Sequence, residues 1–253
     1  MSELEQFKKF AAQLAKESGE IIRSYFRTPI SVESKYDSSP VTIADKKAEE
    51  LMRKKIISEF PDHGIIGEEF GDLNPNAEYK WILDPIDGTK SFICGTVTFG
   101  TLIALVKNNE PILGIIYQPI LKELLVGDNL TCKLNGAKVK VRECKNLSEA
   151  VLLTTDHLNI KKYQNIEKFN SLLEMVKLYR NWGDCYGYYL LATGYADIMI
   201  DPIMNVWDLM ALIPIIEGAG GTITDYHGND PVKGNSIIAS SKKIHKNIIN
   251  LLN

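Results

Sequence analysis

The sequence predicts an α/β protein in which an α+β lobe is followed by an α/β lobe. In the first half, apolar residues at helical spacing give way to a series of closely spaced strand patterns. From about residue 150 onward, short strand patterns alternate with helical ones. We expect lobes at 1–146 and 147–253, packed as one compact unit because no linker, repeat or low-complexity stretch separates them.

The first lobe should begin with two helices. Apolar residues recur at helical spacing over 3–26, and a second helix begins after Thr42 and ends before Pro61. Asn135-Gly136 predicts a tight hairpin turn. Strands are expected between these features near 80–84, 97–107, 111–118 and 123–127.

The second lobe should alternate strands with helices. The expected strands lie near 150–155, 197–200, 222–224 and 236–239. The expected helices lie near 163–176, 185–193 and 241–252, with an almost wholly apolar one from Trp207 to the glycine-rich segment 218–221. A helix that is apolar on all sides is buried, so an acid at its beginning can face an interior cleft.

Composition excludes several classes of function. The chain has 253 residues, 45% of them hydrophobic, and a formal charge of −3, so it can bury a large core but offers no field for nucleic-acid phosphates. An acidic N-terminus and short apolar stretches predict a cytoplasmic protein without a membrane partner. Four scattered cysteines indicate packed thiols, and no spacing typical of a zinc site is present.

The segment from Trp81 to Thr89 carries the strongest chemical signal. An apolar strand should stop at Pro85, which places Asp84, Asp87 and the Ile86 carbonyl at its end. Oxygen ligands of this kind suit Mg²⁺. Gly88 allows close approach of a ligand, and Thr89 begins a helix whose free N–H groups favour a phosphate. Taken alone, the same residues equally favour an ordinary turn.

Two distant segments favour the metal interpretation. Glu68 and Glu69 lie between Gly67 and Gly71 after a short apolar pair, although a solvated loop would look similar. Asp208 precedes the buried apolar helix, where it could also serve as an ordinary N-cap.

Together these segments resemble the signature blocks of the inositol monophosphatase superfamily. The blocks are Gly67-Glu68-Glu69, Asp84-Pro85-Ile86-Asp87-Gly88-Thr89, and Trp207-Asp208 with Glu217-Gly218-Ala219-Gly220-Gly221. From Asp45 to Gly221 they cover most of the chain. The resemblance implies a layered αβαβα sandwich of the inositol monophosphatase and fructose-bisphosphatase type, with the active site between the lobes and a homodimer as the assembly.

The resemblance also implies a role for each residue. The metal ligands, for about two or three Mg²⁺ ions, would be Glu68, Asp84, Asp87, Asp208 and the Ile86 carbonyl. Thr89 would hold the attacking water with Asp45 as its acidic partner, and Glu69 would help to orient water. The N–H groups of Gly88 and Thr89 would bind the phosphate. The implied reaction is direct attack of metal-activated water on a small phosphate monoester. For Asp45, an exposed acid at a helix start is the alternative.

Two further acids point to the substrate. Asp201 matches the family position that binds substrate hydroxyls, and Asp184 stands where a small uncharged residue is common. Two acids beside the leaving group favour a cationic substrate. The blocks 183–188 and 201–208 resemble the histidinol-phosphate phosphatase branch, which implies a role in histidine biosynthesis. The alternatives are an inositol-1-phosphatase, a broad sugar-phosphate phosphatase or a regulatory binding protein, and Asp184 could instead be a helix N-cap.

Overall fold

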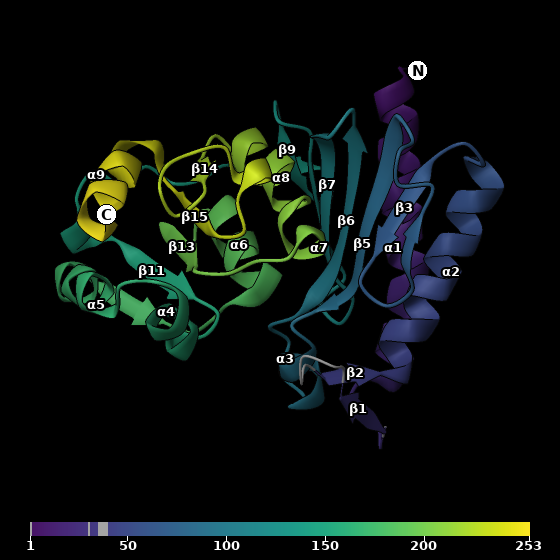
Figure 1. The fold of residues 1–253 in the computed structure, drawn as a ribbon, viewed down its shortest axis with the longest axis horizontal. Helices are drawn as coiled ribbons and strands as arrows, with labels where there is room; N and C mark the ends of the chain where they lie inside the picture. Colours follow the sequence, from purple (N-terminus) through teal and green to yellow (C-terminus); the bar gives the residue numbers. More distant parts are fainter. Residues whose placement is uncertain (1, 30, 35–39) are drawn as a thin grey trace.

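The structure, a computed structural model, describes residues 2–29, 31–34 and 40–253, and its elements are stacked in alternating layers of helix and sheet (Figure 1). The first layer consists of α1 (Glu3–Tyr25) and α2 (Ile43–Glu59), and a short ribbon of β1 (Val32–Ser34) and β2 (Pro40–Thr42) lies beside them. Both helices lie where the apolar periodicity predicted them. The Thr42 hydroxyl caps α2 by accepting a hydrogen bond from the Ala44 N–H at 3.1 Å.

The second layer is an eight-stranded sheet in the order β10-β9-β8-β7-β6-β5-β3-β4. Neighbouring strands run antiparallel except for β3 and β5, which are parallel. The prediction missed β3, β4 and β9, which are too short to show a repeating pattern. The strands are β3 (Gly64–Gly67), β4 (Gly71–Leu73), β5 (Tyr79–Asp87), β6 (Gly100–Lys107), β7 (Glu110–Gln118), β8 (Glu123–Gly127), β9 (Cys132–Leu134) and β10 (Ala137–Lys138).

The predicted turn at Asn135-Gly136 is confirmed. Leu134 pairs with Ala137 across the two-residue loop, and both loop residues have positive φ, 47° for Asn135 and 87° for Gly136. Such values are required by the tight turn that fits the twist of a hairpin.

The prediction that β5 stops at Pro85 is wrong. The strand continues to Asp87, and its pairing with β6 shifts register between Asp84 and Asp87. Pro85 lacks an N–H donor, so a local irregularity in the ladder accommodates it without ending the strand. The Thr101 hydroxyl donates a hydrogen bond to the Pro85 carbonyl at 2.8 Å. The strand therefore carries both acids of this segment into the site.

The middle layer consists of α6 (Asp184–Ala192), α7 (Val206–Leu209) and α8 (Leu212–Gly218). The single helix predicted from Trp207 to the glycine-rich segment is divided in two. Pro214 has no N–H to donate to the Met210 carbonyl, so a continuous helix would lack one of its bonds at this place. These helices pack their apolar residues against one face of the large sheet, although they come from the second half of the chain. The division of the chain into lobes at 146 stays a prediction.

The fourth layer is a five-stranded sheet in the order β12-β11-β13-β15-β14, in which β12, β11 and β13 are parallel. Beyond it lie α4 (His157–Tyr163), α5 (Ile166–Met175) and α9 (Lys242–Leu252). The helix expected over 163–176 begins later because Asn165 caps α5, and α4 and β12 were missed. The strands are β11 (Val151–Thr154), β12 (Leu178–Arg180), β13 (Ile198–Asp201), β14 (Thr222–Thr224) and β15 (Ile237–Ser240).

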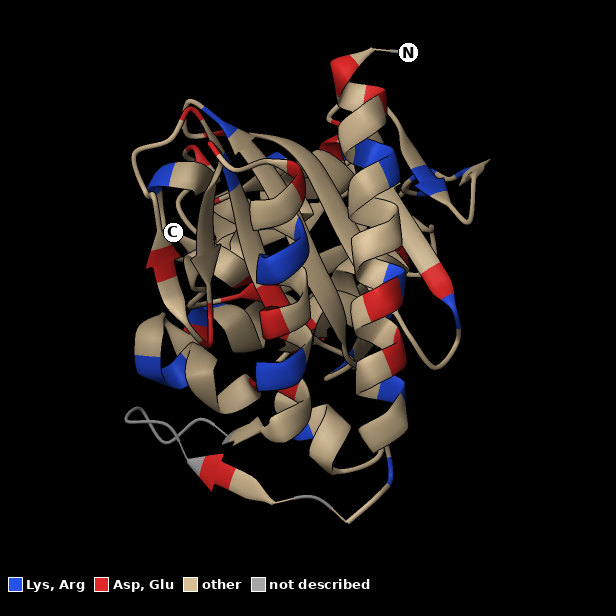
Figure 2. Cartoon of the chain, turned by 90° about the vertical axis from the view of Figure 1, so that its right-hand side faces the viewer, with Lys and Arg blue, Asp and Glu red and all other residues tan. Residues whose placement is uncertain are grey.

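The surface agrees with the mixed composition. On the side formed by α1 and α2, Lys and Arg are interspersed with Asp and Glu (Figure 2). Ion pairs such as Lys55 with Glu17 join them. Cys132, Cys144 and Cys185 are buried free thiols, and Cys94 is exposed. This agrees with the expectation from the sequence that the thiols are mostly packed in the interior. Among the described residues, no helix has the length and apolar character needed to cross a membrane.

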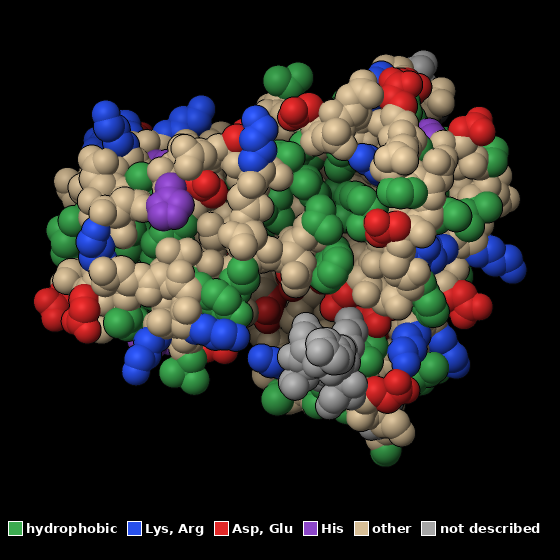
Figure 3. Space-filling view, viewed as in Figure 1, with side chains coloured by type: hydrophobic (Ala, Val, Ile, Leu, Met, Phe, Trp, Pro, Cys, Tyr) green, Lys and Arg blue, Asp and Glu red, His purple; other side chains and the backbone are tan. Residues whose placement is uncertain are grey.

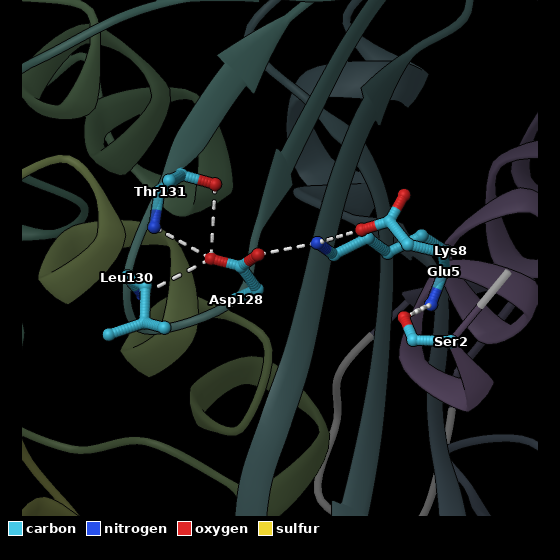
Figure 4. Close-up of polar contacts among 6 residues, drawn as sticks. All are labelled: Ser2, Glu5, Lys8, Asp128, Leu130 and Thr131. Carbon is cyan, nitrogen blue, oxygen red and sulfur yellow. Dashed lines mark hydrogen bonds and ion pairs between the residues drawn. The ribbon is translucent and has the colours of Figure 1, made fainter.

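One ion pair joins α1 to the turn between β8 and β9 of the large sheet. Lys8 donates to Asp128, which also accepts from the N–H groups of Leu130 at 3.1 Å and Thr131 at 2.6 Å (Figure 4). Burial alone would raise the pKa of Asp128, but these hydrogen bonds and the charge of Lys8 hold it below its ordinary value. The pair therefore stabilises the fold while Asp128 is ionised.

We expect Lys8→Met to lower the free energy of unfolding at neutral pH by about 1 kcal/mol, measured by urea titration. The neighbouring exposed Lys9→Met is the control and should change it little. Because the pKa of Asp128 is lowered by folding, the stabilisation is present above its ordinary value of 3.8 and is lost as pH falls through the lower folded value. A difference between the variant and the native protein that grows below that pH would contradict this.

Candidate active site

Three carboxylates from β5 and α7 converge at one place. Oxygen atoms of Asp84, Asp87 and Asp208 all lie within 4.8 Å of one another. Glu68, which follows β3, is close enough to share a hydrogen bond with Asp84. Segments far apart in the sequence thus supply an acidic cluster, which we define as Glu68, Asp84, Asp87 and Asp208. It brings together all four acids that the resemblance assigns to metal binding.

Burial and mutual repulsion change the acidity of this cluster. Burial, then the charges of Glu68, Asp87 and Asp208, raise the pKa of Asp84 well above its ordinary value. Burial, opposed by hydrogen bonds from Asn205 and reinforced by Glu68, raises the pKa of Asp208 to about 6. Without a counter-ion, the acidic cluster is therefore hard to ionise fully.

The donor set fits a hard divalent cation. Asp84 is 1% exposed, and within residues 2–29, 31–34 and 40–253 its Oδ1 atom has no hydrogen-bond partner, although an unsatisfied buried polar atom is costly. The cluster offers carboxylate oxygens, the ligand type that Mg²⁺ and similar ions prefer. A cation at this place would both satisfy Asp84 and offset the repulsion.

Backbone and side-chain hydrogen bonds hold the cluster in position. The Cys185 N–H donates to the Asp87 carboxylate, and the Asn205 N–H donates to Asp208 Oδ2 at 3.0 Å. The Thr89 hydroxyl donates to the Ile86 carbonyl at 3.0 Å. Each group is fixed by a neighbour on another residue, so the geometry is preformed.

Gly88 and Thr89 lie next to the acidic cluster, at the end of β5. Gly88 has φ of 89°, and a Cβ there would lie 2.9 Å from Asp184 Oδ2, so only glycine fits. Thr89 begins α3 (Thr89–Ile93), as predicted. The roles of both N–H groups in phosphate binding stay predictions.

A cleft opens beside the acidic cluster. One hollow of about 290 Å³ is lined by Glu68, Gly88, Thr89 and Asp184, and an adjoining one of about 100 Å³ reaches Asp87, Asp201 and Asp208. The two hollows share Thr155, Asp156, Asn159 and Asp184. In the space-filling view, acidic side chains lie in a hollow between the two halves of the molecule (Figure 3). A larger hollow of about 470 Å³ next to α1 and α2 contains none of these acids.

The two predicted substrate acids differ in how firmly they are held. Asp201 is 3% exposed and accepts hydrogen bonds from the Thr155 N–H at 3.1 Å and the Tyr188 hydroxyl at 2.9 Å. Among the described residues, the Asp184 carboxylate accepts one long hydrogen bond, of 3.4 Å, from the Ser91 hydroxyl. Burial, then repulsion from Asp201 and Asp208, raises the pKa of Asp184 to about 7. The carboxylate of Asp184 is thus the less satisfied of the two.

Asp184 is not the N-cap of α6, contrary to the alternative raised from the sequence. Gly183 occupies the cap position, and Asp184 is the first helical residue, with φ of 49°. A non-glycine residue with positive φ is strained, and such strain concentrates at functional sites. The Asp184 N–H donates to the Thr155 hydroxyl at 2.9 Å.

Asp45 and Thr89 are not joined by a hydrogen bond in the described part of the chain. Asp45 is fully buried, contrary to the alternative of an exposed acid, and its Oδ2 accepts from the Thr42 hydroxyl at 2.6 Å. Its Oδ1 has no hydrogen-bond partner among the residues that the structure describes. Burial, opposed by Thr42 and reinforced by Glu68, raises the pKa of Asp45 to about 6. The roles of Asp45, Thr89 and Glu69 in activating water stay predictions.

Several residues of the site escaped the sequence analysis. Thr155, at the end of β11, contacts both Asp184 and Asp201, and Glu49 of α2 supports the turn that carries Glu68. A signal existed for Glu49, because it lies one helical turn after Asp45 on the same face of the helix. No local pattern marks Thr155, whose role arises from the packing of β11 beside β13.

The chain was compared with known proteins. Residues 3–253 match the family model described as "Inositol monophosphatase family". The chain is 48% identical over 231 residues to the "Bifunctional phosphatase IMPL2, chloroplastic" of Arabidopsis thaliana, spanning 90% of this chain and 66% of that protein. It is 37% identical to the histidinol-phosphatase of Chlorobaculum parvum, spanning 95% of this chain and 94% of that one.

Solved structures give the same result for the fold. The inositol monophosphatase from Zymomonas mobilis has a TM-score of 0.89 and 37% identity, and the match covers 100% of this chain and 99% of that one. The extragenic suppressor protein suhB from Bartonella henselae has a TM-score of 0.90 and 25% identity, over 97% of both chains. The predicted layered αβαβα architecture is thereby confirmed.

The raised pKa values predict an unusual dependence of stability on pH. A carboxyl group with a higher pKa in the folded chain takes up protons on folding, so stability falls as pH rises through that interval. For Asp45 and Asp208 the interval runs from 3.8 to about 6. In the presence of a chelator, we expect thermal unfolding to occur at progressively lower temperature across this interval. A melting temperature that rises instead would contradict it.

We also expect Asp84→Asn to raise the melting temperature of the chelator-treated protein at neutral pH, because it removes a carboxyl group whose ionisation is opposed by burial and by the neighbouring acids in the folded chain. A gain of roughly 1–3 kcal/mol in the free energy of unfolding is expected, or about 2–4 °C for each kcal/mol. The exposed Asp72→Asn is the matched control. Destabilisation by Asp84→Asn in chelator would mean that this carboxylate stabilises the fold.

Proposed function

The chain belongs to the inositol monophosphatase family and is a phosphatase of this family, and we propose that it is a Mg²⁺-dependent histidinol-phosphatase. The observation that supports this substrate is the group of carboxylates around Asp184 in the cleft, which outnumber the one cation, Lys90, among the described lining residues. Asp201 and Asp208 both act on its pKa, and Asp156 lines the same hollow.

We assign the metal site to the acidic cluster and the Ile86 carbonyl. The convergence of carboxylate oxygens within 4.8 Å and the unpartnered Oδ1 of Asp84 support this assignment. When bound, about two or three Mg²⁺ ions would neutralise the phosphate charge and lower the pKa of an adjacent water. The carboxylates of the acidic cluster then need only keep their positions, and the hydrogen bonds to Asp87 and Asp208 hold them there.

In the proposed hydrolysis, the oxygen of a water attacks phosphorus directly while the bond from phosphorus to the alcohol oxygen breaks. The Thr89 hydroxyl donates its proton in a hydrogen bond to the Ile86 carbonyl, so the hydroxyl oxygen is left to accept a hydrogen bond from the attacking water. Asp45, with a pKa of about 6, is suited to take up a proton near neutral pH. The leaving alkoxide takes up a proton from solvent as Asp45 returns its proton to solvent, so protons balance, and Gly88 and Thr89 bind the phosphate through their N–H groups.

Charge complementarity favours a cationic leaving group. Histidinol carries an ammonium and an imidazole, which can donate charge-assisted hydrogen bonds to Asp184. Inositol offers neutral hydroxyls that gain less from a carboxylate. Relatives named histidinol-phosphatase in Chlorobaculum parvum and Mycobacterium tuberculosis support the same substrate, at 37% and 32% identity.

Inositol-1-phosphate is the second candidate substrate. The solved structure from Zymomonas mobilis is of an inositol monophosphatase. Its identity to this chain, 37%, equals that of the histidinol-phosphatase from Chlorobaculum parvum. Asp201, held by Thr155 and Tyr188, could accept hydrogen bonds from either alcohol. A homodimer and a cytoplasmic location remain predictions from the sequence.

The function is tested by measuring phosphate release with Mg²⁺ from histidinol phosphate and from inositol-1-phosphate. We expect kcat/KM to favour histidinol phosphate by about a hundredfold, worth roughly 2.7 kcal/mol. Equal values would indicate a broad phosphatase, and a preference for inositol phosphate would replace the proposed substrate. Asp87→Asn, in the acidic cluster, should abolish release from both esters in a folded protein.

We expect Asp184→Asn to reduce kcat/KM for histidinol phosphate by about ten- to a hundredfold, the value of a charged hydrogen bond. The reduction for inositol-1-phosphate should be much smaller, because a neutral amide still bonds to a hydroxyl. Asp72→Asn on the exposed surface is the control. An equal loss on both substrates would mean that Asp184 supports the site without recognising the cation.

A further inference from the structure

The carboxylate of Glu68 is presented by a very short turn. β3 and β4 pair antiparallel, with Gly67 opposite Gly71, so that only residues 68–70 connect them. Gly71 has φ of 68°, which closes the hairpin. The Glu68 N–H donates to the Leu83 carbonyl at 3.2 Å, next to Asp84 in β5. The position of the Glu68 side chain therefore depends on the backbone of this turn.

Glu49 of α2 holds the rest of the turn. Its carboxylate accepts hydrogen bonds from the N–H groups of Glu69 at 2.8 Å and Phe70 at 3.2 Å. Arg53, one helical turn later, donates its Nε to Glu49 at 2.7 Å and donates to the Gly71 carbonyl as well. Two side chains of one helix thus bind three consecutive residues of the turn.

The environment of Glu49 makes these contacts specific. Its side chain is fully buried, so its charge is balanced within the protein by Arg53 and by two backbone donors. A Cβ on Gly67 would collide with the Glu49 carboxylate, which means that turn and helix are packed at the closest possible distance. The short turn cannot move away from α2 without breaking charged hydrogen bonds.

The same face of α2 also reaches the acidic cluster. Asp45 lies one helical turn before Glu49, and the charge of Glu68 helps to raise the pKa of Asp45. Asp45, Glu49 and Arg53 therefore form a line along the helix facing the turn. Helix α2 sets the position of the Glu68 turn relative to β5.

We propose that Glu49 is a positioning residue that fixes the backbone of residues 68–70, so that the Glu68 carboxylate stands beside Asp84 before a metal arrives. The inference rests on the proposed metal site, because Glu68 acts there as a ligand. The expected consequence concerns affinity, since a turn that must be ordered during binding costs free energy that a preformed turn does not. At saturating metal the turn would be ordered again and turnover would recover.

The test compares Glu49→Gln with Glu50→Gln. The first replaces one acceptor oxygen by an NH₂ group, so it can no longer accept from both Glu69 and Phe70, while the second alters the exposed neighbour. For Glu49→Gln we expect Mg²⁺ affinity by titration calorimetry to fall by about ten- to a hundredfold, with kcat at saturating Mg²⁺ within about twofold of the native value. Glu50→Gln should change neither.

Hydrogen exchange supplies a readout that needs neither metal nor turnover. In chelator, the amides of residues 68–71 should exchange faster in Glu49→Gln than in the native protein, while those of β6 keep their protection. Native Mg²⁺ affinity and native exchange in a folded Glu49→Gln would overturn the positioning role. If that variant does not fold, Arg53→Gln should give the same pattern in weaker form, and a native pattern there would equally overturn it.

A separate outcome distinguishes this inference from the proposed function. If the native protein binds no Mg²⁺ in calorimetry, the metal site itself fails, and the positioning role falls with it. If the native protein binds Mg²⁺ and Asp87→Asn does not, a native affinity in Glu49→Gln overturns only the role of Glu49.

Discussion

The concentration of buried carboxylates at one place is the constraint on which the rest of this structure depends. Like charges in a poorly solvated site repel one another, and burial raises their pKa values well above the ordinary range. Such a cluster persists only if its members are held from outside by hydrogen bonds. The donors here are the N–H groups of Cys185 and Asn205 and the side chain of Asn205. These hydrogen bonds thus keep the mutually repelling carboxylates together until a cation offsets their charge.

The layered architecture explains why these groups can meet. β5 lies within the large sheet and carries Asp84 and Asp87, whereas α7 lies in the middle layer and carries Asp208. The hairpin of β3 and β4 carries Glu68 and lies along the edge of β5 that does not pair with β6. Each layer therefore supplies a part of the site, and the cleft lies where the large sheet and the middle helices end together. Helix α2 contributes from the first layer, through Asp45 and Glu49.

Much of this arrangement could be predicted from the sequence, and the exceptions have physical reasons. Long helices and strands with clear periodicity were found at nearly their observed bounds, as with α1 and β8. Proline was misleading twice: β5 continues through Pro85, because a register shift removes the need for its N–H, and Pro214 divides a helix that its apolar composition suggested was continuous. The metal acids were found from the order of the motifs. Glu49 could have been found from its helical spacing after Asp45, whereas Thr155 acts through the packing of β11 beside β13, which no local pattern reveals.

The contact between Asp87 and α6 has a consequence for how this family diversifies. The Asp87 carboxylate is bonded by the N–H of Cys185, and the residue before it is Asp184, whose carboxylate occupies the space beside Gly88. The N–H that holds Asp87 and the carboxylate that we propose to face the substrate therefore belong to neighbouring residues, Cys185 and Asp184. A change at 184 that alters the positive φ of this residue would move the N–H on which Asp87 relies, whereas a change that keeps the backbone conformation, such as Asn, would not. Divergence of substrate range at this position is thus tied to catalytic competence, and new specificities should arise more freely at Asp156 and Asn159, which line the same cleft but do not hold Asp87.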